Sequence, residues 1–286
     1  MISRDRSLLK IGNKCFDVQN HTYVMGILNL TPDSFSDGGK WVDRDKALYR
    51  VEEMLAEGMH ILDVGGESTR PGYTTISDEE EISRVVPVIE NIKSRFDVPV
   101  SLDTYKAQVA RAGIKAGADL INDIWGLKKD KAMAKVIADS GVACCLMHNR
   151  KEADYQELIP DMQRDMQESI ELALAAGISK EKIILDPGIG FGKAYVDNME
   201  VLRRMEDFHE LGYPLLLGAS RKSVIGLTLD LPVEERLEGT LVTTVMAVLK
   251  GYAFVRVHDI KENVRAIRMA EAIKQGGMSV YGRDSY

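Results

Sequence analysis

The chain has 286 residues, of which 45% are hydrophobic and 28% are charged, and its formal net charge is −7 at pH 7. This is an ordinary globular composition, and the acidic balance argues against a nucleic-acid surface, which requires a basic face. No apolar run approaches the roughly 20 residues that span a bilayer, and the N-terminus lacks the apolar core of a signal peptide. Three cysteines without CxxC spacing predict neither a disulfide framework nor a zinc site, so we expect a cytosolic protein without membrane or nucleic-acid partners.

The first segment, residues 1–20, predicts a hairpin, because a Gly12-Asn13 turn separates LLKI from KCFDV. We expect this hairpin to cover the bottom of the fold that follows. Residues 21–275 would form that fold and residues 276–286 a C-terminal tail, so that the whole chain is one domain.

Eight short apolar runs rich in β-branched residues follow, separated by longer amphipathic stretches. The runs cover residues 23–30, 60–66, 98–103, 119–124, 142–148, 182–186, 213–219 and 252–257. Their near-continuous hydrophobicity is typical of parallel strands that are covered on both faces. The stretches between them repeat Leu, Val, Ile and Met at helical spacing, for example in 45–58, 78–96 and 234–251. Several end at a glycine, as helices often do.

Eight strand–helix units predict an α/β protein built as a single (β/α)8 TIM barrel with an N-terminal hairpin. The alternative is an open, doubly wound parallel sheet. The GxGxxG fingerprint of dinucleotide-binding sheets is missing after the first run, which favours the barrel.

Polar residues stand at the carboxyl end of nearly every predicted strand, where barrel enzymes carry their chemistry. They are Asn29, 67–70, Asp103, Asn122, Asp123, His148, Asp186, 220–223, Arg256, His258 and Asp259. Asp103 and Asp186 each end an apolar run, where an inward carboxylate is unfavourable unless something binds it. For Asp259 the favoured interpretation is a helix N-cap.

The loops after these strands predict a ligand site. TPDSFSDGG (31–39), GGESTRPG (65–72) and DPGIGFGK (186–193) are rich in glycine, so they can approach a ligand closely, and they display Phe35 and Phe191. The last one is not a Walker A loop.

Basic residues of the same loops would gather at one rim and favour an anion: Arg70, Arg221, Lys222, Arg256 and His258. For Arg221, however, the favoured interpretation is a solvated surface charge. With two carboxylates and an asparagine in the same barrel mouth, the pattern indicates a ligand with an anionic end and a heterocycle bearing ring N–H groups.

Seven of these segments together resemble the dihydropteroate synthases of the folate pathway, in order and at that family's spacing, from about residue 24 to residue 260. The segments are MGILNLTPDSFSDGG, DVGGESTRPG, SLDT, INDI, LDPGIGFGK, SRKS and RVHD. The resemblance implies condensation of 6-hydroxymethyl-7,8-dihydropterin diphosphate with p-aminobenzoate to give 7,8-dihydropteroate and pyrophosphate, with Mg2+ assisting. It also implies a homodimer formed through helices late in the chain.

The resemblance further assigns roles to residues of this chain. The pterin would be held by Asp103, Asn122, Asp186 and Lys222, with Met147 on its face, although Met147 could also be plain core. The diphosphate would lie against Asn29, Arg256 and His258, with Mg2+ on Asn29 and Asp37. The p-aminobenzoate site would comprise Phe35, Thr69, Pro71, Phe191 and Ser223.

Catalysis would then depend on Asp37, Asp103, Lys222 and Arg256, in a dissociative displacement that needs no covalent nucleophile. MHNRKEADYQE (147–157) departs from the family pattern and leaves the roles of Asn149 and Arg150 open. Two alternatives stand: a methyltetrahydrofolate-dependent methyltransferase on the same barrel, and a non-catalytic pterin-binding homologue.

Overall fold

The computed structural model describes residues 8–30, 40–67 and 75–276, with side chains from residue 45 onward in the second segment. Its centre is a ring of eight parallel strands. In chain order they are β3 (Tyr23–Asn29), β4 (Ile61–Gly65), β5 (Val100–Asp103), β6 (Leu120–Asp123), β7 (Ala143–Met147), β8 (Ile183–Asp186), β9 (Leu216–Leu217) and β10 (Phe254–Val257). The ring closes between β8 and β9, where Leu185 N–H donates to the Pro214 carbonyl over 3.0 Å. The predicted barrel is confirmed and the open sheet is excluded.

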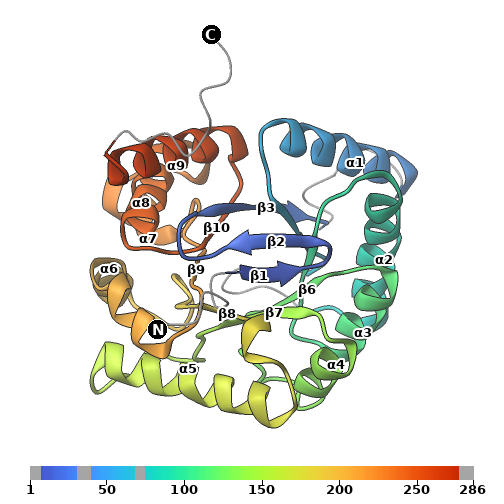
Figure 1. Ribbon diagram of the computed structural model, residues 1–286, viewed down its shortest axis with the longest axis horizontal. Coiled ribbons are helices and arrows are strands. Elements are labelled where there is room, and N and C mark those ends of the chain that lie inside the picture. The colour runs from blue at the N-terminus through green and yellow to red at the C-terminus, as the bar shows by residue number, and fades with distance from the viewer. Residues whose placement is uncertain (1–7, 31–39, 68–74, 277–286) are drawn as a thin grey trace.

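Helices surround the strands on the outside (Figure 1). They are α1 (Lys40–Ala56), α2 (Asp78–Arg95), α3 (Ala107–Ala116), α4 (Met133–Ser140), α5 (Leu158–Ala175), α6 (Tyr195–Arg203), α7 (Ser223–Leu229), α8 (Leu237–Leu249) and α9 (Ile260–Lys274). Short 3-10 turns occupy Lys180–Lys182, Met205–Leu211 and Val233–Glu235, so the helix predicted from residue 234 begins later, at Leu237. Among the described residues, no helix combines the length and the hydropathy needed to cross a membrane.

Side chains along each strand alternate between the helix layer and the barrel interior, as the two-residue period of a strand requires. Leu62, Val64 and Leu102 point outward and join the main core under the helices. The intervening positions point inward, and near the amino ends of the strands they are apolar. They form a second core with the hairpin residues Leu9, Ile11 and Phe16.

The hairpin consists of β1 (Leu8–Ile11) and β2 (Lys14–Asp17), paired antiparallel. It lies across the centre of the ring of helices and covers the bottom of the barrel (Figure 1). This confirms the predicted hairpin and its covering role. The interior therefore has an apolar floor, and the inward positions become polar only toward the carboxyl ends of the strands.

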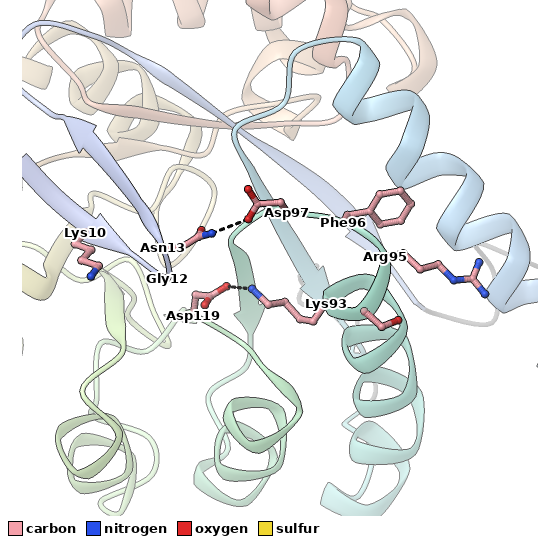
Figure 2. A pocket seen from close by; sticks show the side chains of 9 residues that line it. Lys10, Gly12, Asn13, Lys93, Arg95, Phe96, Asp97 and Asp119 are labelled. Carbon is pink, nitrogen blue, oxygen red and sulfur yellow. Dashed lines mark hydrogen bonds and ion pairs between the residues drawn. The ribbon is translucent and has the colours of Figure 1, made fainter.

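A depression of about 620 Å³ lies beside the hairpin turn, at the amino ends of the strands. Figure 2 shows that both carboxylates in its walls are already paired: Asn13 Nδ2 donates to Asp97 over 2.7 Å, and Lys93 Nζ donates to Asp119 over 2.8 Å. This depression is at the opposite end of the barrel from the polar strand ends, so we assign it to hairpin packing.

Replacing Gly12 by alanine is expected to destabilise the protein more than the same change at Gly141. Both glycines have left-handed φ angles, +58° and +66°, so both variants bear a similar backbone strain of about 1–2 kcal/mol. A Cβ at Gly12 would also lie 2.6 Å from Asp119 Oδ1, whereas nothing lies within 4 Å of one at Gly141. Urea unfolding should show at least about 1 kcal/mol more loss for Gly12→Ala. Equal losses of unfolding free energy would mean that the hairpin turn and Asp119 rearrange around the added methyl group without further cost.

Candidate active site

The guanidinium of Arg256 joins two carboxylates inside the mouth of the barrel. Its Nε donates to Asp63 Oδ2 over 2.6 Å, and its Nη2 donates to Asp103 Oδ2 over 2.7 Å. Ser101 Oγ donates to the other oxygen of Asp63 over 2.5 Å, so this fully buried carboxylate is bonded on both sides. The sequence prediction missed Asp63, although a charged residue inside the apolar run HILDVGG was a usable signal.

Asp103 keeps one acceptor free. Its Oδ1 is buried and has no hydrogen-bond partner among the described residues. Burial raises the pKa of Asp103 to about 7, although the Arg256 charge opposes that shift. A buried acceptor without a donor is unfavourable, so this oxygen is suited to an N–H group of a bound molecule.

A row of paired strand positions places three polar side chains together. Asn29 pairs with Gly65, Gly65 with Asp103, and Asp103 with Asn122. A Cβ on Gly65 would lie 3.7 Å from Asn29 Oδ1 and 3.6 Å from Asp103 Cβ, so the glycine leaves Asn29 and Asp103 on either side of an open position. Asn122 is buried, and its side chain makes no hydrogen bond to another described residue. Its amide can therefore serve a ligand as donor and acceptor.

The opposite side of the mouth carries Asp186 and Lys222. Asp186 Oδ1 accepts from Gly188 N–H over 2.7 Å. A Cβ on Gly218 would lie 3.3 Å from Asp186 Oδ2 and 4.0 Å from Lys222 Nζ, so both groups face the same small gap. Burial raises the pKa of Asp186 and lowers that of Lys222 to about 8, while the attraction between the two charges opposes both shifts.

Apolar side chains form one wall at the carboxyl ends of the strands. Tyr105, Ile124 and Met147 are buried there, with Trp125 and Phe191 packed against them, in a cluster separate from both cores. Lys222 Nζ lies 4.5 Å from the centre of the Phe191 ring. Met147 is thus part of this wall rather than of the main core, and a flat ring could pack on it.

Three polar residues at strand ends support the loops instead of facing the mouth. Asp123 accepts from the backbone N–H groups of Trp125 and Leu127, both over 2.8 Å. Glu67 accepts from Tyr105, Lys106 and the Ile76 backbone over 2.7, 2.7 and 2.9 Å. His148 Nε2 lies 3.1 Å from Asp165, on α5.

The structure corrects two expectations near β10. Asp259 stands at the N-cap position of α9, but its side chain makes no capping hydrogen bond. It accepts from Arg221 Nε over 2.9 Å instead, so Arg221 is neither a solvated surface charge nor a free cation for an anion.

Two further predicted site residues lie nearby. His258 Nδ1 lies 3.0 Å from Ser220 Oγ. Ser223, the first residue of α7, is exposed.

Five predicted site residues lie outside the described residues: Phe35, Asp37, Thr69, Arg70 and Pro71. Among the described residues, no group of three His, Cys, Asp or Glu could hold a metal ion. Mg2+ typically takes only one or two protein oxygens and completes its shell with water and phosphate. Asn29 Oδ1, next to the open position at Gly65, fits that limited role.

The variant segment after β7 also has a structural role. Arg150 Nε donates to Asp165 over 2.6 Å, and its guanidinium lies 4.4 Å from the centre of the Tyr155 ring. The sequence prediction also missed Lys193, whose Nζ lies 2.9 Å from His148 Nδ1.

Fold and site together define a (β/α)8-barrel enzyme with a polar mouth for a heterocyclic ligand. The family model described as pterin binding enzyme matches residues 25–258. A dihydropteroate synthase of Clostridium beijerinckii is 60% identical over 93% of this chain and 99% of its own length. The crystal structure of the Clostridium difficile dihydropteroate synthase in the presence of pteroic acid superposes with a TM-score of 0.89 at 49% identity, covering 90% of this chain and 98% of that one. The Xanthomonas albilineans enzyme with 4-aminobenzoic acid also reaches 0.89, at 38% identity and coverage of 94% and 98%. The chain belongs to the pterin-binding enzymes, and within them to the dihydropteroate synthases, which are transferases of folate biosynthesis.

Proposed function

We propose that this enzyme condenses 6-hydroxymethyl-7,8-dihydropterin diphosphate with p-aminobenzoate, forming 7,8-dihydropteroate and pyrophosphate. The observation that carries the proposal is the unpartnered Oδ1 of Asp103, buried between Asn29 and Asn122. A pterin ring presents N–H donors beside acceptors, which matches carboxylates alternating with an amide and an ammonium group.

In this proposal the pterin lies between the two polar sides of the mouth. Asp103 and Asp186 accept from its ring and amino N–H groups, while Asn122 and Lys222 donate to its acceptors. Met147 contacts its face. These side chains come from strand ends, or from the segment next to β9, so the rigid barrel sets their spacing.

The diphosphate end would lie against Asn29, His258 and Arg256. Two N–H groups of Arg256 are already used by carboxylates, so it would contribute its charge and its remaining N–H groups, two on Nη1 and one on Nη2. Asn29 and Asp37 would hold Mg2+, which supplies charge neutralisation of the leaving diphosphate when bound. Arg70 would add a further positive charge at the rim.

The proposed chemistry is a dissociative displacement. The bond between the pterin methylene carbon and the diphosphate oxygen breaks, and its electron pair leaves with pyrophosphate. The Asp103 carboxylate stabilises the resulting cation, which the electron-rich pterin delocalises. The p-aminobenzoate nitrogen then forms the new bond and releases one proton to water. Phe35, Thr69, Pro71, Phe191 and Ser223 would hold the second substrate.

Incubation of the purified enzyme with both substrates is expected to release pyrophosphate only when Mg2+ is present, in a one-to-one ratio with a pterin–aminobenzoate adduct. Chelation with EDTA should stop the release, and added Mg2+ should restore it. A coupled pyrophosphate assay and mass spectrometry of the product measure both quantities. Methyl transfer from methyltetrahydrofolate without an adduct would replace the proposal, and pterin binding without turnover would indicate a binding protein.

We also propose a homodimer that buries α7, α8 and α9, because these helices expose apolar side chains. Leu227, Val242, Met269 and Ile273 are each at least 60% exposed, which is typical of an uncovered interface. A monomer in sedimentation experiments at micromolar concentration would contradict this assembly.

The cytosol is the proposed compartment, since the adjacent cysteines Cys144 and Cys145 are buried and unpaired. Recovery of the enzyme from a secreted fraction would contradict it.

A further inference from the structure

The loop that joins β8 to α6, residues 187–193, is held mainly by side chains. Its carbonyl oxygens accept from Lys193 Nζ at Gly188 and Phe191, over 3.0 and 2.9 Å, and from Lys222 Nζ at Ile189. Tyr155 OH donates to the Gly192 carbonyl over 2.7 Å. Asn198 Oδ1 also accepts from Gly190 N–H over 2.6 Å. Because the loop has little regular backbone pairing, these side chains help to fix where Phe191 lies.

Lys193 is the central donor in this arrangement. Besides the two loop carbonyls, its ammonium group donates to His148 Nδ1 over 2.9 Å. Burial lowers the pKa of His148 to about 4, so the imidazole is neutral near pH 7. With Nδ1 accepting, the ring carries its proton on Nε2 and donates to Asp165 over 3.1 Å. Arg150 holds the other side of the Asp165 carboxylate.

The loop also lies in direct contact with the backbone that follows β7. A Cβ on Gly188 would lie 2.0 Å from the His148 carbonyl oxygen, and one on Gly192 would lie 2.4 Å from that of Arg150. Glycine at both positions allows the loop to be drawn onto residues 148–150. Burial lowers the pKa of Lys193 to about 7, and the three hydrogen bonds of its terminal nitrogen hold the loop there.

We propose that Lys193 is a positioning residue for the second half of the reaction. It holds the loop so that Phe191 stays at the mouth, under Lys222 Nζ at 4.5 Å from the ring centre, while Lys222 in turn donates to the Ile189 carbonyl. Lys193 acts through the loop and touches neither substrate. The inference rests on the substrate roles proposed above for Phe191 and Lys222.

Lys193→Met keeps an unbranched side chain, shorter by the terminal nitrogen, and removes the three hydrogen bonds of that nitrogen. The loop should then shift, and displacement of a substrate-positioning group by about 1 Å can lower the rate by on the order of 100-fold. We expect the KM for p-aminobenzoate to rise at least about tenfold. Binding of a pterin without diphosphate should change much less, because Asp103 and Asn122 stand on strands. Lys151→Met, at an exposed lysine, is the matched control and should leave both quantities unchanged.

A double-mutant cycle with Phe191→Ala separates positioning from general destabilisation. If Lys193 acts through Phe191, adding Lys193→Met to Phe191→Ala should raise the KM for p-aminobenzoate little further, at a temperature where circular dichroism shows both variants folded. Unchanged KM in Lys193→Met, or independent effects in the cycle, would overturn the inference. If Lys193→Met does not fold, Lys193→Gln, which keeps two N–H donors, takes its place. Wild-type enzyme that forms no adduct would contradict the proposed function instead.

Discussion

Arg256→Met is expected to lower the free energy of unfolding by about 3–5 kcal/mol at pH 8, because it leaves two buried carboxylates without their shared cation. Asp63 is fully buried and Asp103 nearly so, and Arg256 binds both of them. The same variant should lose most of its activity, since the proposed cation stabiliser Asp103 would become protonated. Urea unfolding and the pyrophosphate assay measure the two effects.

The stability defect should depend on pH in a defined direction. Removing the guanidinium raises the pKa of Asp103 further above its unfolded value, so the folded variant binds more protons than the unfolded chain. Its stability therefore falls as pH rises, and the defect should shrink as pH is lowered from 8 through about 7, where Asp103 becomes protonated in the wild type as well. Arg203→Met is the control, because Arg203 forms an exposed pair with Glu200 and should lose at most about 1 kcal/mol. Equal losses in the two variants would show that Arg256 is dispensable for the barrel.

Asp186→Asn is expected to weaken binding of a pterin that lacks the diphosphate by roughly tenfold to 100-fold, which corresponds to about 1.5–3 kcal/mol for a hydrogen bond to a charged group. The asparagine carbonyl can still accept from Gly188 N–H, so the local turn is preserved. What is lost is the negative charge that faces Lys222 across Gly218. Titration calorimetry gives the affinity directly.

Asp123→Asn provides the matched comparison. Asp123 is also a buried carboxylate at a strand end and also accepts backbone N–H groups, but both of its oxygens are used within its own turn. This variant should lose stability while keeping its pterin affinity within about twofold. If Asp186→Asn binds pterin as well as the wild type does, Asp186 has only a structural role.

Much of the fold was predictable because hydrophobic runs, helical spacing and the Gly12-Asn13 turn are local signals. The closed ring of strands and the hairpin beneath it match the prediction. The segment before α8 differs from the prediction of one helix over 234–251. Apolar spacing alone does not reveal that Val233–Glu235 forms a separate 3-10 turn.

The site was less predictable, since proximity to a strand end does not tell which way a side chain points. Asp186 and Asp123 are the last residues of β8 and β6, yet only Asp186 faces the mouth. Asp63 and Lys193 were missed because their partners, Arg256 and His148, lie far away in the sequence. Arg221 was misjudged for the same reason, as its partner Asp259 follows only after α7, α8 and β10.

The two-residue alternation along the strands limits how this chain can vary in length. Deleting or inserting one residue inside β5 would exchange its faces from that point on. The Asp103 carboxylate would turn toward the helices, and the side chain of Leu102 would enter the mouth. Replacing an inward residue changes one side chain. Inserting or deleting a residue instead moves every later side chain of the strand to the opposite face. Descendants of this enzyme can therefore lengthen or shorten their helices and loops, while their strands can change only by substitution.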